Sequence, residues 1–274
     1  MTEPLPKFQN PPVTETALSV QFSPVRGYTA AHGGQFWRDV LGSDWVTATE
    51  APRLPEIHER FGQNQMAGNA LIGAINVNVG LGGSPSPRLQ FRDTSSERMI
   101  QIQNTRFAYN WSRGANRYPS FDRILPEFEK YFARYNEFCR NLQSSELQLD
   151  QWEITYVNNF VKGEMWQTVG DWTKLIPSFV FPGVAVENQV PTSAQIEWQL
   201  TIGENKGRLH VSMLHARLGS PTGPDALVLQ LVARGPIGQD ANLRSGFECG
   251  HEAIVRTFAS MTSKAAHEKW KRIV

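Results

Sequence analysis

The order in which secondary-structure patterns follow one another repeats along this chain, and this repeat constrains the fold more than any other feature. Residues 13–22 alternate between apolar and polar side chains, as a strand with one buried face does. A helix that Thr29 can cap follows this strand. The first half then continues with three strands and a long helix, at residues 88–92, 98–103, 106–112 and 120–142.

The same order returns in the second half. It begins with a strand at 151–160 and a helical turn near 171–176, and it ends with a helix that starts at about Leu243. Between them lie three strands, at residues 192–202, 208–217 and 226–234. A matched order of elements at a period of roughly 130 residues predicts an internal duplication.

We therefore predict an α+β fold built from two β-α-β-β-β-α halves, residues 1–148 and 149–274, which form an antiparallel sheet backed by two long helices. Within the first half, residues 43–87 are rich in proline and glycine and are expected to be an irregular insertion. The element order also resembles the saddle of the TATA-binding protein. That saddle bends DNA with apolar wedges and basic residues, whereas the polar face of this sheet is rich in glutamine, so we do not expect DNA bending.

The nearly neutral net charge of the chain argues against long-range electrostatic attraction to a highly charged partner. The 27 basic and 26 acidic side chains leave a formal charge of +1, so no long-range field draws the protein to nucleic acid or to a membrane surface. The amino-terminal residues lack the apolar core of a signal peptide, and no apolar run approaches the ~18 residues of a membrane span. Cys139 and Cys249 are expected to be core residues rather than a disulfide. We predict a cytoplasmic protein that has no contact with membranes.

Alternation along the strands separates an apolar sheet face from a polar face that is rich in glutamine. Glutamine side chains are uncharged and both donate and accept hydrogen bonds. This polar face is therefore either a solvated surface or a platform that grips a ligand or a protein. The candidate binding residues are Gln90, Arg92, Gln101, Gln103, Arg113, Glu197, Gln199, His210, Gln230 and Arg234.

Arg113 and Arg234 occupy matching places before the two long helices. A guanidinium in such a place either holds an anion or pins the end of the strand to the adjoining structure. We favour the structural role for both residues.

The sequence favours a binding protein over an enzyme. His251-Glu252 begins like a zinc-protease helix, but Val255 stands where the second histidine would be, so we interpret the pair as a helix-surface feature. Glu153 and Glu197 would be a carboxylate pair only if their strands were neighbours. We therefore predict no catalytic residue, no metal site and no cofactor.

Short motifs spread over nearly the whole chain resemble a bacterial protein family of about this length, sporadically distributed and without an established activity. They are residues 4–8 and 10–15, 100–103 with Phe107 and Asn110-Trp111, 153–158, Gly170-Asp171, 207–212, 233–235, and the tail from Gly250-His251-Glu252 through Trp270. A patchy distribution is typical of defence, toxin–antitoxin and immunity genes. The resemblance implies a role of that kind, and it assigns no functional residue.

Our first functional hypothesis is a non-catalytic cytoplasmic binding protein, the partner, inhibitor or sensor subunit of another protein. A homodimer is compatible with it. The alternative is an RNA- or nucleotide-binding protein, with nuclease activity in one variant, which would use Arg92, Arg106, Arg113, His210 and Arg234. A small-molecule sensor with a pocket between the two halves is a third option.

Overall fold

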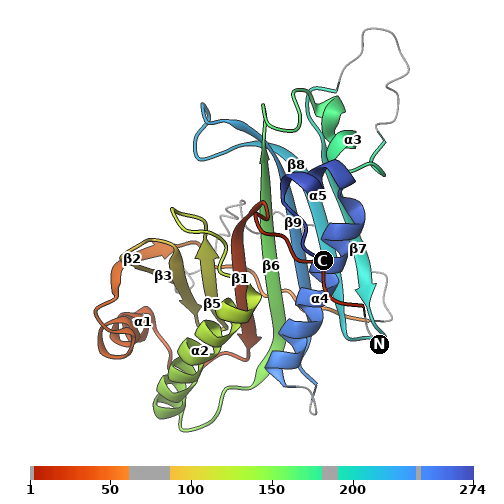
Figure 1. Ribbon diagram of the computed structural model, residues 1–274. Helices are drawn as coiled ribbons and strands as arrows, with labels where there is room; N and C mark the ends of the chain where they lie inside the picture. Colours follow the sequence, from red (N-terminus) through yellow and green to blue (C-terminus); the bar gives the residue numbers. More distant parts are fainter. Residues whose placement is uncertain (1–2, 62–86, 181–190, 239–241) are drawn as a thin grey trace.

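The computed structural model describes residues 3–61, 87–180, 191–238 and 242–274. In these residues nine strands form one antiparallel sheet, in the order β2-β3-β4-β5-β1-β6-β9-β8-β7 (Figure 1). Helices pack against this sheet, and the predicted α+β class is therefore confirmed. Within the described ranges, no helix is both long and apolar enough to cross a membrane.

The elements of the first half lie close to their predicted positions. They are β1 (Val13–Phe22), α1 (Ala30–Phe36), β3 (Arg88–Asp93), β4 (Arg98–Gln103), β5 (Arg106–Ser112) and α2 (Phe121–Gln143). A π-helical turn, Trp37–Leu41, extends α1. The alternation of side chains predicts these strands because one face of each is apolar, although β4 and β5 are in fact buried on both faces.

One strand falls in the stretch that we expected to be irregular. β2 (Trp45–Ala51) pairs with β3 at the edge of the sheet. Most of its side chains are exposed on both faces, so its sequence shows no alternation between apolar and polar residues. The expectation of an irregular insertion is therefore wrong for this strand, while residues 62–86 lie outside the described residues.

The second half contains β6 (Leu149–Val161), a 3-10 turn (Val169–Asp171) and α3 (Trp172–Leu175). It continues with β7 (Gln195–Ile202), β8 (Gly207–Arg217), β9 (Asp225–Pro236), α4 (Leu243–Met261) and α5 (Lys264–Lys269). β1 and β6 pair with each other at the centre of the sheet. On one side of this pair the order continues β5-β4-β3, and on the other side it continues β9-β8-β7.

Both long helices cover the same face of the sheet (Figure 1). α2 packs Phe128 against Phe107 of β5, and α4 packs on β6 and β9. Gly246 and Gly250, one turn apart on α4, allow close contact with β6, because a Cβ at either position would lie within 2.7 Å of the Trp152 ring. Cys139 is buried on α2 and forms no disulfide, as expected.

Candidate functional site on the polar sheet face

A segment of the chain itself crosses the sheet face opposite α2 and α4, which we call the polar face. This segment, residues 52–60, is here named the strap. It follows β2 and contacts β4, β1, β6 and β8 in turn, so it spans both sides of the central β1–β6 pair. The centre of the polar face, where Gln103, His210 and Arg234 are buried, is therefore not the solvated surface that was one of the two alternatives above.

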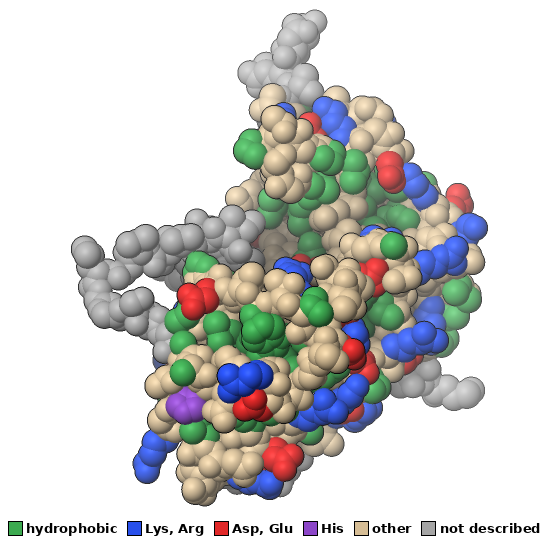
Figure 2. Space-filling model, turned by 90° about the vertical axis from the view of Figure 1, so that its left-hand side faces the viewer, with side chains coloured by type: hydrophobic (Ala, Val, Ile, Leu, Met, Phe, Trp, Pro, Cys, Tyr) green, Lys and Arg blue, Asp and Glu red, His purple; other side chains and the backbone are tan. Residues whose placement is uncertain are grey.

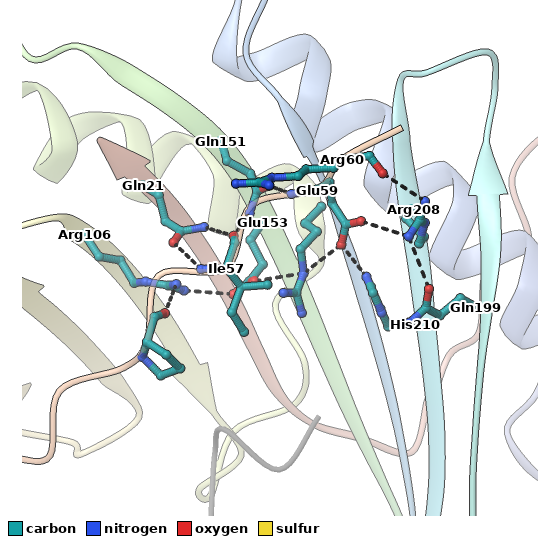
Figure 3. Close-up of polar contacts among 12 residues, drawn as sticks. Gln21, Ile57, Glu59, Arg60, Arg106, Gln151, Glu153, Gln199, Arg208 and His210 are labelled. Atoms are coloured by element: carbon teal, nitrogen blue, oxygen red, sulfur yellow. Dashed lines mark hydrogen bonds and ion pairs between the residues drawn. The ribbon is translucent and has the colours of Figure 1, made fainter. Parts of the chain in front are cut away.

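Three glutamine side chains hold the strap by its backbone, and Figure 3 shows two of them, Gln21 and Gln151. Gln103 donates to the carbonyl of Leu54 at 3.0 Å and accepts from its N–H at 3.1 Å. Gln21 forms the same two bonds with Ile57, at 2.8 and 3.2 Å. Gln151 donates to the Ile57 carbonyl and accepts from the N–H of Glu59. These amides thus hold a segment of this chain itself, and the prediction that the polar face grips a ligand or another protein stays a prediction.

The end of the strap buries a carboxylate (Figure 3). Glu59 has a side chain that is 1% exposed, and its Oε1 lies 2.5 Å from Nε2 of His210. Arg208 approaches Oε2 at 3.5 Å, and Nε of Arg234 lies 3.7 Å from Oε1. A buried carboxylate is tolerated only when cationic and hydrogen-bonding groups compensate it, and these three side chains from β8 and β9 do so.

Glu153 of β6 extends this ionic network. Its two oxygens lie 3.1 Å from Nη1 of Arg106 and 3.2 Å from Nε of Arg234. Burial acts to raise the pKa of Glu153, but the charges of Arg234 and Arg106 lower it below its usual value. Glu153 is thus held ionised and is a poor proton donor. Glu197 lies on β7, which β9 and β8 separate from β6, so the two glutamates do not form the carboxylate pair considered above.

A hollow of about 300 Å³ opens on the polar face beside the strap. Its floor is made of small side chains from β1 and β5, Ala17, Ser19 and Ala108. Residues from both sides of the β1–β6 pair surround this floor. They are Arg88, Gln90, Gln101, Arg106, Asn110, Glu153, Gln230 and Arg234, with Leu54, Pro55 and Ile57 of the strap.

Polar atoms around the hollow lack partners. Nη1 of Arg234, Nε of Arg106, Nε of Arg88 and Oγ of Ser19 are buried and have no hydrogen-bond partner in the described part of the chain. Buried donors are normally paired, and leaving one unpaired costs about 1–3 kcal/mol. A ligand or ordered water in the hollow would supply partners for these donors.

One wall of the hollow is a directed chain of hydrogen bonds across four strands. Gln90 donates to Gln101 at 2.9 Å, Gln101 donates to Asn110 at 2.7 Å, and Asn110 donates to Glu15 at 2.6 Å. Each amide uses its NH₂ group toward the next residue, and the chain ends on a carboxylate that can only accept. The side chains of this wall are thereby fixed in place.

The structure brings some of the predicted binding residues together and separates others. Gln90, Gln101, Gln230 and Arg234 line the hollow, and Gln103 and His210 hold the strap. Gln199 accepts from Arg208 at 3.3 Å. Arg92 and Glu197 lie away from the hollow, on β3 and β7.

Arg113 lies away from the hollow as well. Its guanidinium donates to the carbonyls of Val13 and Pro11, at 2.7 to 2.9 Å. It therefore pins the start of β1, which is the structural role favoured above, although carbonyls take the place of a carboxylate.

Several residues of the site were absent from the predicted set. Gln21, Gln151 and Glu153 continue the polar alternation of β1 and β6, and this signal was sufficient to find them. Arg88 lies at the first residue of β3, two positions before Gln90. Glu59 lies in an irregular segment with no periodicity, so its sequence neighbourhood carries no sign of its role.

A second cavity, of about 770 Å³, lies between α2 and α4 on the opposite face of the sheet. His251 lines it, stacks on Phe121 at 4.1 Å, and contacts the Tyr156 hydroxyl at 3.0 Å through Nδ1. Tyr156 in turn contacts the hydroxyl of Tyr118. Burial lowers the pKa of His251 to about 4. The interpretation of the His251-Glu252 pair as a helix-surface feature holds for the exposed Glu252 but not for His251, which is half-buried and turned toward α2.

Comparison with family models, with characterised proteins and with solved structures found no match to this chain. The resemblance to a bacterial family stays a prediction. The side of the molecule shown in Figure 2 carries basic and acidic side chains intermixed, without a broad patch of one sign.

Proposed function

We propose that this chain is a non-catalytic binding protein, acting in the cytoplasm as a sensor or partner subunit, and that the hollow on the polar face holds its ligand. The observation that carries the proposal is the set of buried, unpaired donors of Ser19, Arg88, Arg106 and Arg234 around that hollow. A surface that served packing alone would have its buried donors paired.

The chemistry of the hollow supports binding over catalysis. Glu153 is kept ionised by two arginines, so it lacks the raised pKa that a general acid needs near neutral pH. The amides of Gln90, Gln101 and Asn110 are tied into one directed chain and serve to orient a ligand. Fixed donors around a small pocket are typical of specific ligand recognition.

The test is to purify the tagged protein from its host and to analyse the denatured eluate by mass spectrometry for small molecules and for proteins. The proposal expects a bound small molecule in the wild-type protein. Ala17→Leu should lose this molecule, because the larger side chain fills the floor of the hollow. Ala48→Leu, on the exposed edge strand β2, is the matched control and should keep it. A molecule that Ala17→Leu retains as fully as the wild type does would contradict this location.

Nucleotide binding remains the second candidate because arginines gather in the hollow. Arg106 and Arg234 belong to the set that this alternative would use, and Arg88 joins them. Arg113 does not, since it binds backbone carbonyls. Absorbance at 260 nm in the eluate, and affinity that falls steeply with salt, would favour a nucleotide or RNA.

The strand order supports the proposed internal duplication. β1-β5-β4-β3 on one side of the sheet centre corresponds to β6-β9-β8-β7 on the other, and each series is followed by one long helix. In such an arrangement the hollow lies next to the junction of the two halves. A ligand there would contact both halves, which suits a sensor.

A further inference from the structure

The charge balance around the hollow indicates the class of its ligand. Three guanidinium groups line it, those of Arg88, Arg106 and Arg234, whereas the carboxylates that line it are those of Glu15 and Glu153. We propose that the hollow binds a compact anion, a small molecule that carries a carboxylate or phosphate group. This inference rests on the proposed function and names the ligand class for the same site.

The two carboxylates are already engaged. Glu15 accepts from Asn110, and Glu153 is shared between Arg106 and Arg234. Among the described residues, Arg88 forms no ion pair, and its Nε is buried without a hydrogen-bond partner. One guanidinium in the hollow thus forms no direct ion pair with the described protein, although the charge of Glu15 acts on it. A planar guanidinium pairs with the two oxygens of a carboxylate or phosphate, which makes such a group the matching occupant.

The arginines also act unfavourably on one another. Burial, and after it the positive charge of Arg106, lowers the pKa of Arg88, while the negative charge of Glu15 opposes them. Burial likewise lowers the pKa of Arg106, and the charge of Arg234 adds to this effect while Glu153 opposes it. An anion placed among these groups would relieve the repulsion between them and would satisfy the open donors of Ser19 and Arg234 at the same time.

The size of the hollow limits the rest of the molecule. A volume of about 300 Å³ lies at the lower end of the range for ligand pockets, which is about 300–1,000 Å³. The strap residues Leu54, Pro55 and Ile57 close one side of it. A metabolite-sized anion fits this space, whereas a segment of nucleic acid would need a longer groove. The amides of Gln90 and Gln101 at the wall favour a ligand with further polar atoms.

The experiment compares anions with neutral molecules of similar shape. Binding of succinate, inorganic phosphate and adenosine monophosphate is measured by isothermal titration calorimetry, with succinamide and adenosine as the uncharged counterparts. We expect at least one anion to bind, and a neutral counterpart to bind about tenfold more weakly or worse, since a hydrogen bond to a charged group contributes about 1.5–3 kcal/mol.

Two variants on one strand locate the effect. Arg88→Gln removes the one guanidinium of the hollow that forms no ion pair with the described residues. This variant should weaken anion binding at least about tenfold and leave the melting temperature nearly unchanged. Arg92→Gln, four residues further along the same face of β3, lies outside the hollow and should bind as the wild type does. Equal affinity of Arg88→Gln and wild type for every anion, or no binding of any anion, would overturn the anion class.

The outcomes separate this inference from the proposed function. If succinamide or adenosine binds as tightly as its charged counterpart, and Ala17→Leu abolishes that binding, the hollow is a ligand site and only the anion class is wrong. If Ala17→Leu changes neither the binding of any of these compounds nor the molecule that co-purifies, the hollow is not the ligand site and both proposals fail.

Discussion

Gln103 forms with Leu54 the two hydrogen bonds that a neighbouring strand would form: its carboxamide accepts from the Leu54 N–H and donates to the Leu54 carbonyl. A side chain thus takes the place of a backbone partner. The strap crosses the strands of the sheet and cannot pair with them edge to edge, so glutamine side chains that point out of the sheet satisfy its backbone. The same arrangement recurs at Gln21 and Ile57.

Replacing one of these glutamines should destabilise the protein more than its place on a sheet surface suggests. Gln103→Leu leaves the N–H and C=O of Leu54 without their partners in a poorly hydrated position, at an expected cost of about 1–3 kcal/mol in the free energy of unfolding. Urea denaturation measures this. Gln195→Leu, on the exposed edge strand β7, is the control and should change stability by less than about 0.5 kcal/mol.

Glu59→Gln should have a larger effect. The amide can still contact His210, but it removes the negative charge that Arg208 and Arg234 face in a buried setting. Breaking a buried ion pair on one side costs about 3–5 kcal/mol. The strap should also become more susceptible to trypsin at Arg60. Glu56→Gln, an exposed neighbour in the strap, should show neither change, and a normal urea midpoint for Glu59→Gln would contradict the role given to this network.

The free energy of unfolding should decrease as the pH falls through the range between the unfolded-state and folded-state pKa values of His251. Its pKa is lowered from 6.5 to about 4 in the folded protein. Between these values the unfolded chain binds a proton that the native protein does not, so stability rises with pH across the window and is lost as the pH falls from about 6.5 toward about 4. The shift corresponds to about 3 kcal/mol.

His251→Phe tests this origin. Phenylalanine keeps an aromatic ring against Phe121 and cannot take up a proton, so urea denaturation between pH 7 and pH 4.5 should show a flatter dependence of stability on pH. The exposed His58 provides the control, and His58→Gln should leave the pH dependence as it is in the wild type. An unchanged slope in His251→Phe would assign the acid sensitivity to other groups.

Two glycines in helices should respond to alanine in opposite directions. Gly246→Ala places a Cβ 2.4 Å from the Trp152 ring, so α4 must move away from β6, at an expected cost of about 1–3 kcal/mol. Gly34 in α1 has open space at its Cβ position, and Gly34→Ala should stabilise by up to about 1 kcal/mol because alanine loses less backbone entropy on folding. Thermal denaturation of the two variants measures both effects.

The sequence by itself determined the strands, the long helices and the two sheet faces. Side chains that alternate along β1, β6 and β8 report burial locally, and the three-to-four-residue spacing along α2 does the same, so these elements lie close to their predicted bounds. β2 escaped prediction because an edge strand exposed on both faces has no alternation to read. His251 was misplaced because its burial depends on α2, which is remote from it in sequence.

The strap and the hollow were decided only by the tertiary structure. Glu59 meets His210 and Arg234 across more than 150 positions of chain, and nothing in its own neighbourhood indicates that contact. Local periodicity reports which side of an element is buried, but it does not report what covers that side. The glutamines could be identified as a polar platform from the strands alone. These glutamines hold a segment of their own chain, and Arg88 lies beside it without an ion pair in the described residues. Both facts depend on how non-local segments pack, and no spacing in the sequence encodes this packing.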